Sequence, residues 1–329
     1  MKSKYIILVL VLLAVSLSSV YAGNSRRIGT AGAAELLIPV GSRGTAMGGA
    51  VVSNVVGVES IFWNPAGLAE LDGTEVMFTH QPYLADIDVN YFGLATRIYG
   101  FGTIGASAKI VSIGDMEETT YDETEGTGRK FNPTLSVLSM SYAKILTANV
   151  SFGATAMFIH EKIFEAQATG LAFDVGFKYD PRWKGVSFGV AIKNYGPTMK
   201  FTGDGFYYTV DGITVAGKSK DFELPSSINM AVSYDFLDNG PNFASISGNF
   251  RSNNFYEDVY STGFEYVYDG KYSIRGGYNF TEDDNYLYGA SVGAGILFEL
   301  GSTQMSVEYS WTETDVFDDN QYFTFKMLF

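Results

Sequence analysis

The feature that most constrains this chain is a rhythm of alternating apolar and small polar residues, which recurs from Thr74 to Phe329. Alternation with a period of two places apolar side chains on one face of a β-strand and polar side chains on the other. An even number of such strands is typical of a closed antiparallel barrel. We recognise fourteen stretches of this kind: 74–82, 87–98, 102–114, 133–145, 149–163, 168–180, 185–196, 226–238, 242–254, 257–269, 271–281, 286–299, 303–313 and 319–329.

The connections between these predicted strands alternate between short and long. Every second connection is tight, as at Tyr99-Gly100-Phe101 and Asn239-Gly240-Pro241, where the residues suit hairpin turns. The others are mostly longer, and the two longest cover residues 115–132 and 197–225. Because outer-membrane barrels carry short turns in the periplasm and long loops outside the cell, the connections also predict an orientation.

The two faces of the predicted strands differ as a membrane requires. In the last strand, Phe323, Phe325 and Met327 share one face. A charge on a lipid-facing position costs about 2–4 kcal/mol at mid-bilayer, so the polar face must line the lumen. A water-soluble β-sandwich is the alternative, but its wet face would carry long charged side chains, and here that face is mostly Ser, Thr, Gly and Asn. We therefore predict an all-β fold, a 14-stranded antiparallel transmembrane β-barrel over residues 74–329.

Residues 1–22 predict a secretory signal peptide. Met1-Lys2-Ser3-Lys4 is basic, residues 5–15 are apolar, and Val20-Tyr21-Ala22 suits a cleavage site. An uncleaved membrane anchor is the alternative, but the apolar run is shorter than the roughly 20 residues of a spanning helix. We expect an integral protein of the bacterial outer membrane with its N-terminus in the periplasm.

Composition narrows the partners of the chain. There is no Cys, which removes disulfides and thiolate metal sites. The 22 Lys and Arg against 36 Asp and Glu give a net charge of −14, which argues against nucleic acid as a partner. The 22 Tyr and 25 Phe suit the aromatic girdles of a barrel, so outer-membrane lipid is an expected partner.

Residues 23–73 do not alternate and predict a different structure. Gly-rich turns over 41–49 precede a short helix, for which Asn64 is a good N-cap and Pro65 suits the first helical position. This segment is too small for a core of its own and too apolar for a linker. We expect it inside the barrel as a hatch or plug. Disorder in the periplasm is the alternative, and Ile61-Phe62-Trp63 argue against it.

Alternation also predicts charged side chains in the lumen. Both signs are present, so these side chains can pair across the lumen or with hatch residues such as Arg43 and Glu59. One interpretation is a set of ion pairs that holds the plug in place, and the other is a polar path or a head-group site. The predicted lumen charges are Lys109, Asp174, Lys178, Lys193, Arg251, Glu265, Arg275, Glu308 and Lys326.

Some sequence patterns suggest catalysis or metal binding, but the residues around them lack the features that this chemistry needs. Residues 100–105 match a dinucleotide fingerprint, and residues 185–189 and 289–293 match Gly-x-Ser-x-Gly, but none is followed by the helix that the chemistry needs. His80 and His160 are the only histidines and have no ligand spacing. The acidic loop over 115–125 lacks the fixed spacing of a Ca²⁺ loop. We expect no catalytic residues, no metal, no cofactor and no enzyme activity.

Three motifs near the N-terminus resemble the PorV/PorQ family. They are Ala34-Glu35-Leu36-Leu37-Ile38-Pro39-Val40-Gly41-Ser42-Arg43-Gly44, Met47-Gly48-Gly49-Ala50 and Phe62-Trp63-Asn64-Pro65-Ala66-Gly67-Leu68-Ala69. That family resembles the FadL long-chain fatty-acid transporters, fourteen-stranded barrels whose N-terminal hatch contains an Asn-Pro-Ala segment. The resemblance marks a hatch motif of Arg43, Gly44, Gly48, Gly49, Asn64, Pro65, Ala66 and Gly67.

The resemblance implies two functions. PorV-like proteins belong to the type IX secretion apparatus, where they bind the C-terminal signal domains of secreted proteins and carry them to the attachment machinery. FadL-like proteins pass hydrophobic molecules, such as long-chain fatty acids, through a plugged barrel and out sideways at a kinked strand. We predict the first function, with secreted cargo and other secretion components as partners. The second, with a hydrophobic ligand as partner, is the alternative.

The two functions place hydrophobic surface differently. A solute channel needs a continuous apolar path through lumen and hatch, whereas a cargo shuttle needs an exposed rim that grips a folded domain. Aromatic residues in the long loop over 197–225 could serve either function. The candidate binding residues there are Phe206, Tyr207, Tyr208 and Phe222.

Overall fold

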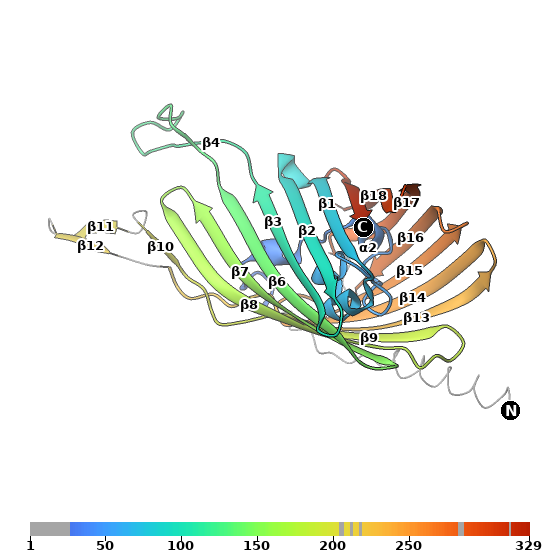
Figure 1. Cartoon of the computed structure of the whole chain (residues 1–329). Coiled ribbons are helices and arrows are strands. Elements are labelled where there is room, and N and C mark those ends of the chain that lie inside the picture. Colours follow the sequence, from blue (N-terminus) through green and yellow to red (C-terminus); the bar gives the residue numbers. More distant parts are fainter. Residues whose placement is uncertain (1–26, 204–206, 211–212, 217–218, 282–285, 316) are drawn as a thin grey trace.

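Fourteen antiparallel strands close into a barrel in the computed structural model of the chain (Figure 1). The structure describes residues 27–203, 207–210, 213–216, 219–281, 286–315 and 317–329. Each barrel strand pairs with its neighbours along the chain, and β1 pairs with β19, for example Val76 with Met327, to close the ring. The barrel strands are β1 (Thr74–Pro82), β2 (Asp88–Ile98), β3 (Gly102–Ser112), β6 (Thr134–Thr147), β7 (Val150–Ile163), β8 (Ala166–Tyr179), β9 (Val186–Tyr195), β13 (Ser227–Asn239), β14 (Asn242–Asn253), β15 (Val259–Tyr268), β16 (Tyr272–Phe280), β17 (Tyr288–Leu300), β18 (Thr303–Thr314) and β19 (Asn320–Leu328). The predicted fourteen-stranded barrel is confirmed.

Five short strands lie in the long connections, at one end of the barrel. β4 (Met116–Glu117) pairs with β5 (Lys130–Phe131), and β11 (Tyr207–Val210) pairs with β12 (Ile213–Ala216). β10 (Phe201–Gly203) pairs with the part of β8 that extends past β9. We call this the loop end of the barrel, and the opposite end, where the hairpin turns are tight, the turn end (Figure 1).

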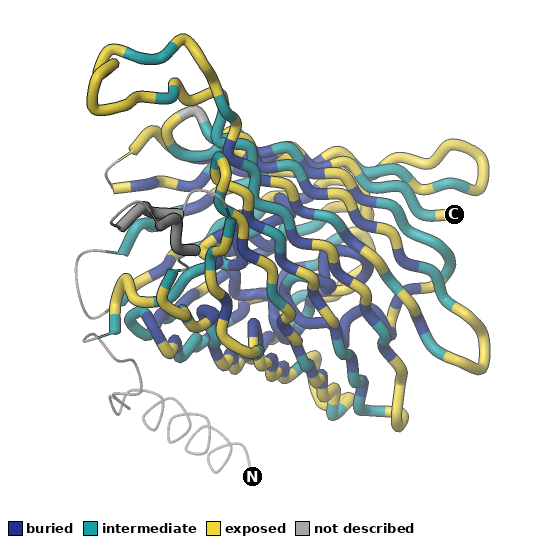
Figure 2. Tube along the Cα trace, turned by 90° about the vertical axis from the view of Figure 1, so that its left-hand side faces the viewer, coloured by how far each residue is buried: buried dark blue, intermediate teal, exposed yellow. Residues whose placement is uncertain are grey.

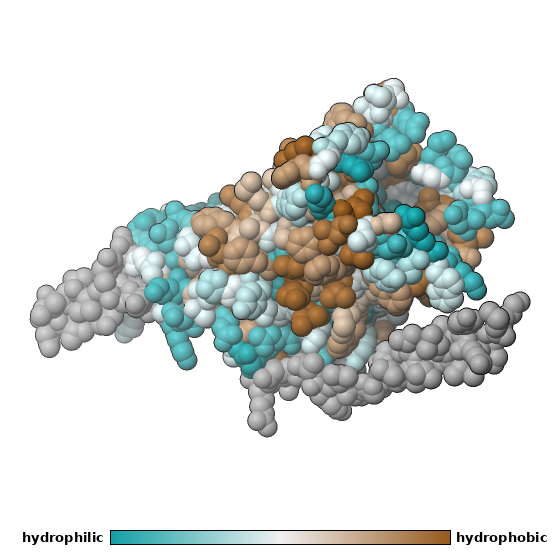
Figure 3. All heavy atoms as spheres, turned by 60° about the horizontal axis from the view of Figure 1, so that its bottom comes forward, coloured by the Kyte–Doolittle hydropathy of each residue, from teal (hydrophilic) through white to brown (hydrophobic). Residues whose placement is uncertain are grey.

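Exposure alternates along the strands. On β19, Phe323 is 47% exposed while Tyr322 and Thr324 are buried. Hydrophobic residues gather over the middle of the barrel wall, with hydrophilic residues towards its ends (Figure 3). The barrel therefore turns apolar side chains to lipid and small polar side chains inwards. Among the described residues, no helix is long and apolar enough to cross a membrane.

The segment from Arg27 to Gly73 packs against the inward faces of the strands, and α2 lies within the ring of strands in Figure 1. It contains four short helices, η2 (Ala34–Leu37), α2 (Ser42–Ala46), α3 (Ser60–Trp63) and η3 (Pro65–Glu70), and one more, η4 (Leu84–Asp86), follows β1. Val58, Ile61 and Leu68 form a buried cluster with Met77 and Tyr91 of the wall. The core thus lies between the segment and the barrel wall, where buried residues concentrate (Figure 2).

The segment runs from the loop end to the turn end. Arg27 forms an ion pair with Glu223, 2.7 Å long, and donates a hydrogen bond to Asn254, both at the loop end. Gly73 leads into β1 at the turn end. A periplasmic N-terminus stays a prediction, and the position of Arg27 beside the long loops speaks against it.

Candidate functional site in the lumen

A buried network of ion pairs ties the segment to the barrel wall. The Arg43 guanidinium donates two hydrogen bonds to Glu265 of β15, with N–O distances of 3.0 and 2.7 Å. Arg275 of β16 lies opposite Glu265 in the strand register and donates to the same carboxylate at 2.7 Å. One carboxylate on the wall thus receives a guanidinium from each side.

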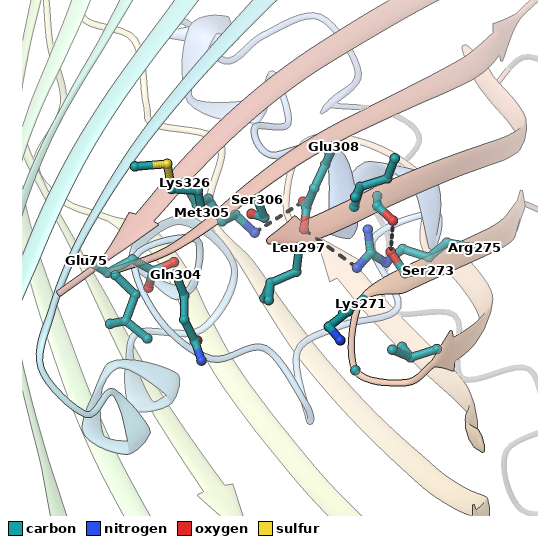
Figure 4. A pocket seen from close by; sticks show the side chains of 15 residues that line it. Glu75, Lys271, Ser273, Arg275, Leu297, Gln304, Met305, Ser306, Glu308 and Lys326 are labelled. Atoms are coloured by element: carbon teal, nitrogen blue, oxygen red, sulfur yellow. Dashed lines mark hydrogen bonds and ion pairs between the residues drawn. The ribbon is translucent and has the colours of Figure 1, made fainter. Parts of the chain in front are cut away.

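The network continues around the wall and returns to the segment. Arg275 pairs with Glu308 of β18 at 3.6 Å, and Lys326 of β19 pairs with the same carboxylate at 3.3 Å (Figure 4). Lys326 also pairs with Glu59 of the segment at 2.7 Å. Glu59 also accepts a hydrogen bond from the backbone N–H of Gly44 at 2.7 Å. None of the six side chains is more than 17% exposed, so removal of one partner would leave a buried charge.

A second group of charges surrounds Phe62. The Lys109 and Lys193 ammonium groups lie 4.7 and 4.2 Å from the centre of the Phe62 ring, as in cation–π contacts. Lys109 donates to the Ile38 carbonyl at 3.0 Å, while Lys193 donates to the Phe62 carbonyl and pairs with Asp174 at 3.2 Å. These lysines hold the middle of the segment from β3 and β9.

Two predicted lumen charges remain, Lys178 and Arg251, and they have different contacts. Lys178 donates to the Val55 carbonyl at 3.1 Å and pairs with Glu70 at 2.7 Å, so it also holds the segment. Arg251 lies apart and donates a hydrogen bond to the Tyr286 hydroxyl at 2.6 Å. The structure therefore brings seven of the nine predicted charges into contact with the segment or the network, while Asp174 reaches the segment only through Lys193 and Arg251 lies apart.

Asn64-Pro65-Ala66 rests on a depression in the wall. The Asn64 side chain accepts from the Ala66 N–H at 3.1 Å as an N-cap of η3, and donates to the Val52 and Phe177 carbonyls. Below it, Gly153 of β7 and Gly176 of β8 are register partners. A side chain at Gly153 would overlap Pro65, and one at Gly176 would overlap Asn64.

Among the other hatch motif residues, Gly44 and Gly49 lie against Trp63. A side chain at Gly44 would overlap the Trp63 indole, whose N–H donates to the Val40 carbonyl at 3.1 Å. Gly48 and Gly49 have positive φ angles of 61° and 80°, which glycine adopts without strain. Ala66 and Gly67 are buried in η3. The motif residues thus determine the local fold of the segment and its position against the barrel wall.

Glu35 is a buried acid whose position the sequence analysis did not single out. It is 1% exposed and lies beside Glu161, a second buried carboxyl on β7. Burial raises the pKa of Glu35 to about 8, the charge of Glu161 adds to the rise, and Lys109 opposes it. An acidic residue inside the apolar run over 33–40 was the available signal.

Two cavities lie at opposite ends of the lumen. The turn-end cavity has a volume of about 220 Å³ and is lined by Glu75, Lys271, Arg275 and Lys326 (Figure 4). The loop-end cavity, which we call the vestibule, has a volume of about 600 Å³ and is lined by residues that include Trp63, Tyr288 and Arg251. Thr45 of α2 and the segment residues Gly48 and Gly49 are among the residues that line the vestibule.

The predicted binding loop is only partly within the described residues. Phe206 lies outside them, and for Tyr207 and Tyr208 only the strand β11 is described. Phe222 is partly buried, packs with Phe201 at a ring distance of 5.6 Å, and lies against Gly32. Phe222 therefore packs between the loop and the segment, where it has little surface for a partner. Tyr121, in the loop between β4 and β5, is 97% exposed.

No third acid or imidazole joins any pair to make a metal site: across the described ranges there is no group of three or more His, Asp or Glu that could hold a metal ion.

The closed ring of strands and its apolar outer face define a β-barrel of the outer membrane. The family model of the type IX secretion system protein PorV matches residues 21–239, and the chain belongs to this family. No curated protein matches the chain.

Solved structures share the fold at low identity. The toluene transporter TodX of Pseudomonas putida is 13% identical, with a TM-score of 0.58 over 88% of this chain and 98% of that one. The toluene transporter TbuX of Ralstonia pickettii is 15% identical, with a TM-score of 0.54 over 88% and 98%. A FadL homologue of Pseudomonas aeruginosa is 14% identical, with a TM-score of 0.53 over 88% and 97%.

Proposed function

We propose that this protein binds secreted cargo at the loop end of the barrel and carries it within type IX secretion, while residues 23–73 act as a plug that keeps the lumen closed. The observation that carries the proposal is the buried ion-pair network, which begins at Arg43 and returns to Glu59 in the same segment. Membership of the PorV family supports the same function.

The network argues against a solute path through the lumen. A channel for hydrophobic molecules needs a continuous apolar route, but buried charges lie between the two cavities. Moving the segment away would separate Arg43 from Glu265 and Glu59 from Lys326, which are the two ion pairs of the network between segment and wall. Breaking a buried pair typically costs about 3–5 kcal/mol, so a closed lumen is the stable state.

The loop end offers surface for a protein partner. Tyr121 is 97% exposed, and Met116 and Phe317 are 46% and 49% exposed, all in connections at this end. Exposed apolar side chains that gather beside polar residues are typical of protein-binding surfaces. The loop over 197–225, with Phe206, Tyr207 and Tyr208, would extend this surface.

A second function, passage of hydrophobic solutes, is favoured by the vestibule. Its volume of about 600 Å³ is within the range of about 300–1,000 Å³ that small-molecule sites occupy. The structures of similar fold include toluene transporters. This function would require the segment to move, because the vestibule ends at the segment.

A pull-down from the native outer membrane separates the two functions. Tagged wild-type protein should retain secreted proteins that carry a C-terminal β-domain, and the triple variant Phe206→Ser, Tyr207→Ser, Tyr208→Ser should lose them while uptake of a labelled long-chain fatty acid stays unchanged. Tyr99→Ser is the matched control, because Tyr99 is 78% exposed at the turn end. Slower uptake in the triple variant, with no cargo recovered from the wild type, would support the channel instead.

A further inference from the structure

The outer wall of the barrel carries an apolar groove. It has a volume of about 650 Å³ and crosses β2, β3, β6, β7 and β8 on the half of the wall nearer the turn end. One row of register partners across these strands alternates large and small side chains, in the order Leu94, Ala106, Met140, Ala156 and Phe173. The strand pairing continues unbroken through this row, so the groove is a depression in the outer face and not an opening into the lumen.

Aromatic side chains border the groove on its turn-end side. The Phe101 and Tyr142 rings lie 5.2 Å apart, and the Tyr142 hydroxyl donates a hydrogen bond to the Phe101 carbonyl at 2.8 Å. On the next two strands, the Phe152 and Phe177 rings also lie 5.2 Å apart. Aromatic girdles of outer-membrane barrels lie at the membrane–water interface. This end of the groove therefore lies at the depth of lipid headgroups, while the rest of it faces hydrocarbon.

Lys144 lies among these aromatic residues with its side chain on the outer face. It is exposed, follows Tyr142 as the next outward residue of β6, about 7 Å further along the strand, and is the register partner of Phe152. Lys144 forms no ion pair with any carboxylate that the structure describes. A cation without a protein partner thus lies where the apolar groove meets the headgroup region.

The neighbouring turn adds positive charge beside Lys144. The Arg182 guanidinium donates a hydrogen bond to the Ala148 carbonyl at 3.0 Å, which joins the turn after β8 to the turn after β6. Residues 144–149 and 180–185 contain three basic side chains, Lys144, Arg182 and Lys184, and one acid, Asp180. In a chain with a net charge of −14, this part of the turn end therefore suits an anionic group.

We propose that the groove is a specific site for an anionic phospholipid, with an acyl chain along the groove and the phosphate at Lys144. An ammonium group binds phosphate oxygens through charge-assisted hydrogen bonds. A groove that is apolar along its length and basic at its headgroup end matches the amphipathic shape of a phospholipid. A transmembrane protein segment would cover the apolar part but would need an anion of its own at Lys144. The site lies outside the lumen, so the inference does not depend on cargo binding.

Native mass spectrometry of the whole barrel tests the proposal. Delipidated protein in detergent is incubated with equal amounts of phosphatidylglycerol and phosphatidylcholine that carry the same acyl chains, and the lipid that stays bound after detergent exchange is quantified. We expect phosphatidylglycerol to be retained about fivefold more than phosphatidylcholine, the effect of roughly one basic group at a membrane surface. Equal retention of the two lipids, or no retention of either, would overturn the proposal.

Variants assign the retained lipid to the groove. Lys144→Gln should remove most of the preference, while Lys271→Gln, which removes an exposed charge from the turn between β15 and β16, should keep it. Ala156→Phe should fill the groove and lower the retention of both lipids, whereas Ala294→Phe, at an exposed position of β17 outside the groove, should not. A heat-modifiable band shows that each variant is folded.

Three outcomes of the variant experiment would overturn the proposal. The first is an unchanged preference in Lys144→Gln, and the second is an equal loss in each variant and its control. The third is a membrane protein that co-purifies with the wild type and is lost from Ala156→Phe, because the groove would then hold a protein instead of a lipid.

Discussion

The side-chain oxygen of Asn64 lies where a side chain at Gly176 would have to be. This relationship explains why the Asn-Pro-Ala segment and the strands beneath it depend on each other. The Asn64 side chain is buried and caps η3, and a glycine on the wall gives it room. The segment is thus fitted to one place on the wall of β7 and β8.

Replacement of Gly176 by Ala should therefore displace the segment from the barrel wall at Asn64. The added Cβ would meet Asn64, so we expect a loss of about 1–3 kcal/mol in the free energy of unfolding, as for other overpacked sites. Gly248→Ala is the matched control, because a Cβ there would meet nothing within 4 Å. Denaturant titration in lipid measures both, and an equal change in the two variants would contradict this account of the motif.

The ion-pair network should be sensitive to the loss of one member. Lys326→Met leaves Glu59 and Glu308 without their common partner, so we expect a loss of about 3–5 kcal/mol. Lys271→Met removes an exposed pair with Asp269 and should lower the free energy of unfolding far less, because exposed ion pairs contribute little. If the two variants unfold at the same denaturant concentration, the network does not hold the segment.

Glu35 should make stability depend on pH. Its pKa is raised to about 8 in the folded protein from 4.5, so the unfolded chain ionises more easily and stability falls as pH rises between these values. The slope contributed by Glu35 is at most about 1.4 kcal/mol per pH unit. Glu35→Gln should flatten the dependence, whereas Glu117→Gln, in an exposed loop, should not. The measurement is the free energy of unfolding of the wild type and the two variants between pH 5 and pH 8. An equal loss of stability in all three would show that Glu35 does not cause the pH dependence.

Surface labelling of intact cells tests the orientation. A tag at residue 124, in a long loop, should react from outside, and a tag at Gly240, in a tight turn, should not. Labelling at Gly240 alone would reverse the orientation. A tag at the mature N-terminus decides between the predicted periplasmic location and the loop end, where Arg27 lies.

Much of the barrel could be predicted from sequence because its determinants are local. Alternation fixes which side chains face lipid, as on β19, where Phe323 and Tyr322 lie on opposite faces. The same alternation identified Glu265, Arg275 and Lys326 as inward charges. Strand ends differ by a few residues, and the predicted strand at 257–269 becomes Val259–Tyr268.

What could not be predicted depends on contacts between distant parts of the chain. Nothing local pairs Arg43 with Glu265, more than two hundred residues away, or places Arg251 beside the Tyr286 hydroxyl. Phe222 lies in the long loop over 197–225, where the sequence predicted it as a candidate binding residue. The structure instead packs it beside Phe201 because the segment and the loop meet there.

The central claim is that the segment closes the lumen, so that cargo binds at the loop end of the barrel. Ion conductance in planar bilayers tests this claim most directly. The intact barrel should show little or no stable conductance, because the segment fills the space between vestibule and turn end. A barrel without residues 24–70, shown to be folded by its heat-modifiable band, should show large, stable conductance. Equal conductance before and after the deletion would mean that the segment does not close the lumen, and would contradict the account.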